Sequence, residues 1–129
     1  MRDADPREPC GFTLIELLVV LAIVSTLLLL VAPRYFQRVD VAQEAVLRDN
    51  LRTTRQVLDH FQADHGRFPE SLQELVDKRY LRALPVDPLT GSADTWTFLP
   101  PPEGLEGTVY DLHSGSPDTA MDGTMYANW

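Results

Sequence analysis

Hydrophobic residues are concentrated in one early stretch of the chain. Residues 12–32 carry a single charge, at Glu16, and are apolar on every side of a helix. At about 1.5 Å of rise per residue, these 21 residues span about 31 Å, close to the roughly 30 Å hydrocarbon core of a bilayer. A helix buried in a soluble core would instead show an apolar stripe on one side. The pattern therefore predicts a transmembrane helix over 12–32.

The following segment, 33–66, has an amphipathic pattern. Its apolar or small side chains recur at steps of four, three, four and three residues, which places them on one face of a helix. These positions are Leu47, Leu51, Thr54, Leu58 and Phe61. Gly66 predicts the C-terminal end of this helix, and Pro69 prevents its continuation. We therefore expect both segments to form one helix, half in lipid and half outside.

Residues 67–129 predict a small mixed domain that begins with a short helix. Ser71 and Glu74 have the spacing of a capping box, so a helix should start there and end near Tyr80. Two prolines and a glycine within 84–91 predict a turn-rich link after it.

Two β-strands are expected after this link. The segments 95–99 and 108–112 are rich in β-branched and aromatic residues, which favour strands. Residues 100–107 between them contain three prolines and two glycines and have the character of a hairpin loop. An antiparallel hairpin is therefore predicted, and the tail 113–129 shows neither a helical nor a strand period.

Charge is unevenly distributed along the chain. The sequence has 11 Lys and Arg against 19 Asp and Glu, a net charge of -8, and it lacks the basic clusters of a nucleic-acid-binding surface. Residues 83–129 contain no Lys or Arg. Their acids are Asp87, Asp94, Glu103, Glu106, Asp111, Asp118 and Asp122. Such a density of carboxylates favours a bound cation or a basic partner, with a solvated acidic surface as the alternative.

Motifs for catalysis are lacking in the sequence. The histidines at 60, 65 and 113 do not have the spacing of metal ligands, since the first two lie five positions apart and so on different faces of a helix. The chain has no nucleophile elbow and no phosphate-binding glycine loop, and its single cysteine, Cys10, precedes the apolar stretch. We therefore do not expect an enzyme.

A secretory signal peptide is the main competitor of a permanent transmembrane helix. The apolar run is longer than the roughly 7 to 15 residues of a signal peptide. The residues after it, 33–36, read Pro-Arg-Tyr-Phe and lack the small residues of a cleavage site. The helix should therefore remain in the mature protein.

The arginines around the span bear on its orientation. Arg2 and Arg7 precede it, whereas four arginines follow it at positions 34, 38, 48 and 52. By the positive-inside rule, this count weakly favours a cytoplasmic C-terminal part.

Glu16 is the one charge within the span. An ionisable group at this depth costs on the order of 2.5 to 3.5 kcal/mol even on a lenient insertion scale. It either reaches the interface or has a partner, and an amino terminus created just ahead of the span would be such a partner.

Residues 11–20, Gly-Phe-Thr-Leu-Ile-Glu-Leu-Leu-Val-Val, resemble the processing motif of type IV prepilins and type II secretion pseudopilins. The resemblance implies that a prepilin peptidase removes residues 1–11 as a leader by cutting after Gly11. It also implies that the new N-terminal Phe12 is methylated and that Glu16 is needed for assembly. Pro33 lies where this family has a helix-bending proline.

The remainder is similar to the major pseudopilins of type II secretion. This resemblance implies an α+β, type IV pilin-like fold, in which a long N-terminal helix packs through its second half on a small antiparallel sheet. Members of the family bind calcium in a C-terminal loop through two aspartates and backbone carbonyls. By position these are Asp118 and Asp122, although the loop is short, lacks a run of glycines and has Pro117 before Asp118.

The resemblance also implies a topology and a function. Prepilin peptidases act in the cytoplasm, so the leader would be cytoplasmic and residues 67–129 periplasmic, with one pass through the inner membrane and contrary to the arginine count. The chain would polymerise into a periplasmic pseudopilus that drives protein export and would catalyse no reaction. Its partners would be membrane lipid, prepilin peptidase, further copies of itself, minor pseudopilins and the inner-membrane secretion platform, with no nucleic acid.

Two other functions stay open at this point. One is a pilin subunit of a type IV pilus or of a DNA-uptake system, which would share the processing motif. The other is a membrane-anchored periplasmic binding domain that is never processed.

Overall fold

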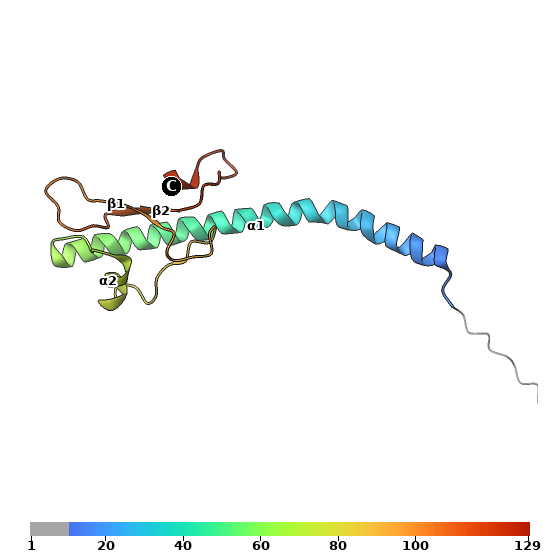
Figure 1. The fold of residues 1–129 in the computed structure, drawn as a ribbon, viewed down its shortest axis with the longest axis horizontal. Coiled ribbons are helices and arrows are strands. Elements are labelled where there is room, and N and C mark those ends of the chain that lie inside the picture. The colour runs from blue at the N-terminus through green and yellow to red at the C-terminus, as the bar shows by residue number, and fades with distance from the viewer. Residues whose placement is uncertain (1–10) are drawn as a thin grey trace, which may run out of the picture. The chain divides into compact units, whose positions relative to one another are not determined.

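The computed structural model describes residues 11–129, which form a long helix and a small domain built on its C-terminal half (Figure 1). The chain divides into two compact units, with the boundary after Gln37. The elements are α1 (Leu14–His65), α2 (Leu72–Asp77), β1 (Thr97–Leu99), β2 (Asp111–His113) and a 3-10 turn over Tyr126–Asn128. The predicted α+β architecture, with a long N-terminal helix packed on a two-stranded antiparallel sheet, is confirmed.

The core of the second unit lies along one face of α1. All five positions of the predicted amphipathic face are buried, which confirms the pattern. They pack with residues from α2, from the segments before β1 and β2, from β2 and from the C-terminal segment, namely Leu72, Leu75, Trp96, Val109, Leu112, Ala120 and Tyr126. Burial of this face removes apolar surface from water and is the main stabilisation of the unit.

Two helix boundaries follow the sequence signals. Gly66 ends α1 in the left-handed conformation, with φ +71°, and its N–H donates to the Gln62 carbonyl at 2.8 Å. At the start of α2, the Ser71 hydroxyl accepts a hydrogen bond from the Glu74 N–H at 3.3 Å, as a capping box requires. Both predictions are confirmed.

The helix α2 ends at Asp77, earlier than predicted. Arg79 adopts a left-handed backbone conformation, with φ 65°. The N–H groups of Tyr80 and Leu81 both donate to the Leu75 carbonyl, at 2.8 and 3.0 Å. This closure satisfies the last carbonyl groups of the helix and turns the chain away from its axis.

The sheet is shorter than the predicted hairpin. The strands pair antiparallel, with Phe98 opposite Leu112, over three residues each. The prediction that strand pairing begins at Thr108 is wrong. The N–H groups of Thr108 and Val109 donate to the Pro69 carbonyl, at 3.2 and 2.9 Å, so this segment pairs with the turn after α1 instead.

The turn-rich link holds a buried carboxylate, that of Asp87. Its side chain is fully buried and accepts hydrogen bonds from the Ser114 hydroxyl at 2.6 Å and the Leu89 N–H at 2.9 Å. Nearby, the Trp96 indole N–H donates to the Pro85 carbonyl at 2.8 Å. Asp87 therefore joins two segments of the chain. It is one of the seven acids of residues 83–129, but because it is buried it does not belong to an acidic surface.

Candidate functional site

The first turn of α1 carries the residues expected to be processed and to act in assembly. The Thr13 hydroxyl accepts a hydrogen bond from the Glu16 N–H at 3.2 Å and so caps the helix that begins at Leu14. Phe12 is 88% exposed and Gly11 is exposed beside it. Thr13 and Glu16 have capping-box spacing, a signal that the sequence analysis did not use.

Glu16 lies in the first helical turn with an exposed side chain. The aligned peptide dipoles favour a negative charge at this end of a helix. Within residues 11–129, its carboxylate has neither a hydrogen-bond donor nor a basic side chain within ion-pair distance. Residues 11–129 therefore supply no compensating charge for Glu16.

The apolar part of α1 has no protein partner among residues 11–37, the described part of its unit. The large apolar side chains from Leu14 to Val31 are 46 to 83% exposed. The most apolar 18-residue window of the helix has a mean hydropathy of 2.9, and none of it is buried. Its Thr26 hydroxyl donates to the Ala22 carbonyl at 2.8 Å, which satisfies this group without water. The helix is long and apolar enough to cross a membrane.

The C-terminal loop that contains Asp118 and Asp122 is closed by its own backbone. The N–H of Ala120 donates to the Thr124 carbonyl at 2.7 Å, and the N–H of Tyr126 donates to the Asp118 carbonyl at 3.3 Å. The structure thus brings the two predicted aspartates into one loop, and the carbonyl groups of Asp118, Ala120 and Thr124 already accept backbone hydrogen bonds.

The carboxylate of Asp122 is also occupied. One oxygen accepts hydrogen bonds from the Thr124 hydroxyl and N–H, at 2.6 and 2.9 Å, which lower the pKa of this carboxyl. The other oxygen lies 3.9 Å from the Arg48 guanidinium. Residues 11–129 contain no group of three or more His, Cys, Asp or Glu side chains that could hold a metal. These hydrogen bonds compete with a metal ion for the Asp122 oxygens, and calcium binding at Asp118 and Asp122 stays a prediction from the resemblance.

Two residues of α1, Glu44 and Arg48, contact the C-terminal segment that contains this loop. Glu44 accepts hydrogen bonds from the Met121 N–H at 2.8 Å and the Tyr126 hydroxyl at 2.9 Å. Burial and the neighbouring Glu44 carboxylate raise the pKa of Tyr126 to about 12. The Arg48 guanidinium lies 4.2 Å from the centre of the Trp129 ring. The loop is therefore positioned by side chains that the sequence analysis did not single out.

Arg55 connects three segments of the second unit. Its guanidinium donates to the Asp111 carboxylate at 2.7 Å, to the Leu112 carbonyl at 3.1 Å and to the Trp129 carbonyl at 2.7 Å. The carboxylates of residues 83–129 are therefore not all without basic partners, because Asp111 and Asp122 face arginines of α1.

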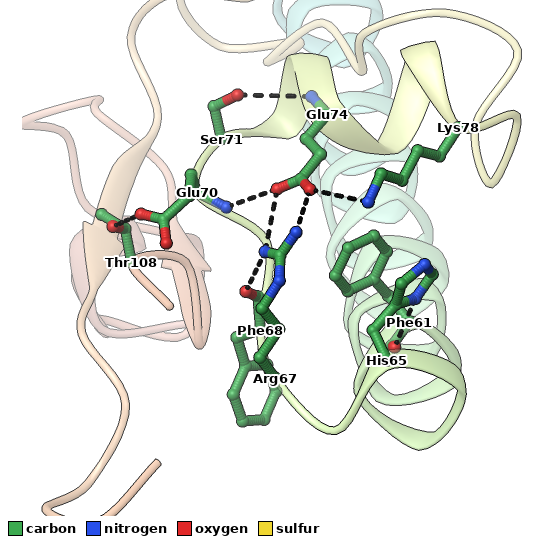
Figure 2. A network of polar contacts seen from close by, with 9 residues as sticks. All are labelled: Phe61, His65, Arg67, Phe68, Glu70, Ser71, Glu74, Lys78 and Thr108. Carbon is green, nitrogen blue, oxygen red and sulfur yellow. Dashed lines mark hydrogen bonds and ion pairs between the residues drawn. The ribbon is translucent and has the colours of Figure 1, made fainter. Parts of the chain in front are cut away.

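A second polar centre surrounds the carboxylate of Glu74 (Figure 2). It contacts the Arg67 guanidinium at 2.5 Å, the Lys78 ammonium at 3.1 Å and the Glu70 N–H at 2.8 Å. The hydrogen bond from Arg67, with support from the others, lowers the pKa of Glu74 to about 2. The Thr108 hydroxyl donates to the Glu70 carboxylate, so the centre also holds the segment before β2.

Comparison with known proteins bears on the first turn of α1. Residues 8–32 match the prokaryotic N-terminal methylation motif. The chain is 31% identical to type II secretion system core protein G of Pseudomonas aeruginosa, over 92% of this chain and 90% of the relative. It is also 31% identical to the protein of this name from Klebsiella michiganensis, over 92% of both chains.

The chain belongs to the type II secretion system core protein G family. The predicted resemblance to the major pseudopilins of type II secretion is thereby confirmed. Competence protein ComGC of Halalkalibacterium halodurans is 31% identical over 58% of this chain and 74% of the relative. No solved structure matches the chain.

Proposed function

We propose that the chain is a structural subunit of a periplasmic pseudopilus that drives protein export by type II secretion. In this proposal the apolar part of α1 crosses the inner membrane and the second unit is periplasmic. The chain itself catalyses no reaction; it binds further copies of itself, minor pseudopilins and the inner-membrane secretion platform. Membership of the core protein G family supports this function.

The observation that carries the proposal is the exposed apolar half of α1. Side chains that are 46 to 83% exposed over Leu14–Val31 need an apolar environment, which is lipid before assembly. In a filament, the spans of neighbouring subunits replace the lipid. A head-to-tail contact of this kind does not close on itself and so extends into a filament.

Processing is the first step that we propose. A prepilin peptidase would cut after Gly11, which is exposed and has no atom within 4 Å of the position a Cβ would take. Mass spectrometry of membrane-extracted protein should then show a chain that begins with N-methyl-Phe12, whereas Gly11→Val should retain the leader. Recovery of intact residues 1–129 from cells with an active peptidase would support an unprocessed anchored domain instead.

Assembly would then depend on Glu16. Cleavage leaves a positive amine on Phe12, and the Glu16 carboxylate of a subunit already in the filament would neutralise the amine of the incoming one. Loss of one half of a buried pair of charges typically costs about 3 to 5 kcal/mol. This contact would also set the axial position of each subunit.

The test measures filament yield by shearing and immunoblot. Glu16→Ala should be inserted and processed normally but should yield no filaments and no secretion, and Glu16→Asp should assemble poorly because its side chain is shorter. Asp94→Ala, at an exposed acid of the second unit, is the matched control and should behave as the unmodified chain. Normal filament yield from Glu16→Ala would overturn the assembly role.

The similarity to a competence protein supports a second candidate, a subunit of a DNA-uptake filament. It covers only 58% of this chain. Deletion of the gene separates the two functions, because loss of protein export with normal DNA uptake supports the first and the reverse supports the second.

A further inference from the structure

A groove runs between α1 and the C-terminal segment of the second unit. It has a volume of about 830 Å³, and part of its lining is apolar. Leu51 is buried, whereas Met125 is 49% exposed and offers apolar surface to an occupant. The charged residues that line the groove are Arg48, Arg52, Arg55, Asp59 and Asp122. In a chain with a net charge of -8, this is a surface with more basic than acidic side chains.

The three arginines of the groove differ in their partners. Arg55 is fully engaged by Asp111 and by two carbonyl groups. Arg48 stacks on Trp129 and lies near Asp122. Arg52 is exposed and, within residues 11–129, has no hydrogen bond or ion pair. Arg52 is therefore the cation that is free to bind a carboxylate.

The loop between β1 and β2 has complementary chemistry. Its tip, 103–106, reads Glu-Gly-Leu-Glu and is exposed throughout. Leu105 is 43% exposed, and no basic side chain of residues 11–129 pairs with Glu103. The tip thus presents an apolar side chain beside a carboxylate, which matches the apolar lining and the guanidinium of the groove.

The β1–β2 loop and the groove lie at different positions along the axis of α1. The carbonyl of Glu106 accepts a hydrogen bond from the Phe68 N–H at 2.8 Å, which fixes the loop near the C-terminal end of α1 (Figure 1). Arg52 lies 13 residues before the last residue of that helix, His65, or about 20 Å at the helical rise. The tip therefore does not reach the groove of its own chain.

We propose that the Glu103–Glu106 tip of one copy docks in the groove of a second copy, with Glu103 against Arg52 and Leu105 beside Met125. This inference rests on the proposed filament and names a contact between its periplasmic parts. Because the two surfaces differ and lie apart on one chain, the contact is head-to-tail, and it extends a filament when the rotation between copies does not close a ring.

Charge reversal and its rescue test the contact in the full chain. Arg52→Glu and Glu103→Arg should each lower the yield of sheared filaments roughly tenfold, since each places like charges together. The double variant Arg52→Glu/Glu103→Arg should restore the yield. Arg82→Glu, a charge reversal at an exposed arginine outside the groove, should leave it unchanged.

The other outcomes overturn the contact. A filament yield at the wild-type level from Arg52→Glu would contradict docking. A double variant that yields no more filaments than the single variants would contradict it as well. Both results would leave the proposed function unaffected. Intact filaments with lost secretion would assign the groove to an exported protein. No filaments from the wild-type chain would contradict the proposed function itself and this contact with it.

Cysteine cross-linking gives a second test that does not depend on charge. In a Cys10→Ser background, Arg52→Cys combined with Glu103→Cys should give a ladder of disulfide-linked multimers on a non-reducing gel. Each single cysteine variant should give no ladder. A cross-link that forms only within one chain would contradict docking between copies.

Discussion

The starts of α1 and α2 share one local motif and differ in everything around it. In both helices a hydroxyl residue accepts a hydrogen bond from the N–H of a glutamate three residues later, Thr13 from Glu16 at 3.2 Å and Ser71 from Glu74 at 3.3 Å. The Glu74 carboxylate has three partners within the chain. The Glu16 carboxylate has none among residues 11–129. The hydroxyl cap marks the helix start in both cases, but the surroundings determine what the glutamate carboxylate does.

The same contrast applies to the two halves of α1. Residues of the second half bury one face against the rest of their unit, whereas the first half leaves its apolar side chains exposed. The second half of α1 therefore contributes to the core of its unit, whereas the apolar side chains of the first half remain available to lipid or to other copies, as the proposed function requires.

The largest expected effect is a difference in unfolding free energy between substitutions in the two halves of α1. Leu58→Ala removes a fully buried side chain, and the cavity should cost about 2 to 5 kcal/mol of unfolding free energy. Leu28→Ala, at a side chain that is 61% exposed, should leave unfolding of the second unit unchanged. Denaturant titration of both full-length variants in detergent, followed by circular dichroism, measures this; equal losses would show that the halves are not distinct.

A smaller difference in stability is expected between substitutions of Glu74 and Glu16. Glu74→Gln weakens hydrogen bonds to charged groups and should cost about 1.5 to 3 kcal/mol. Glu16→Gln should leave the melting temperature of the second unit unchanged, because no partner within residues 11–129 is lost. Thermal unfolding of both variants in detergent decides this, and a lower melting temperature for Glu16→Gln would contradict the contrast.

The pH dependence of stability sharpens the assignment to Glu74. Its pKa falls from 4.5 to about 2 on folding, so its stabilisation is complete above pH 4.5 and is lost as the pH falls towards 2. The unfolding free energy of the unmodified chain should fall more steeply in this window than that of Glu74→Gln. If the unfolding free energies of the two proteins fell in parallel with pH, the contact with Arg67 would not be what stabilises the ionised Glu74 carboxylate.

The smallest expected effect concerns calcium. The carbonyl groups of Asp118, Ala120 and Thr124 and the Asp122 carboxylate already accept hydrogen bonds without a metal, so a chelator should not change the melting temperature. Glu44→Gln should lower it, because this side chain binds both Met121 and Tyr126. A melting temperature that falls on chelation and recovers with added calcium would instead support the site predicted at Asp118 and Asp122.

Local patterns predicted the parts of this fold that depend on nearby residues. The buried face of α1, the Gly66 boundary and the Ser71 cap need only residues within a few helical turns. The wrong start of β2 and the wrong reading of Asp87 have another cause. The Val109 N–H bonds to Pro69 and the Asp87 carboxylate bonds to Ser114, and neither pairing has a signal in local sequence.

The candidate sites divide in the same way. Gly11, Phe12 and Glu16 were found because their motif is contiguous, and their roles stay predictions. The contacts of Glu44, Arg48 and Arg55 were missed because they join α1 to residues far along the chain. A charged residue outside the apolar face of a helix gives no indication in the sequence of which distant residue it contacts.

The small size of the sheet has a consequence for folding. Two strands of three residues each are not stable in water by themselves. Arg55 of α1 holds β2 through Asp111, 56 positions away, and Glu44 of α1 holds the C-terminal turn through Tyr126, 82 positions away. Contacts between residues so far apart slow folding, because a long loop must close before they form. A chain that ends before residue 120 would lack Ala120 and Tyr126, which pack in the core, and should leave part of the buried face of α1 open to proteases.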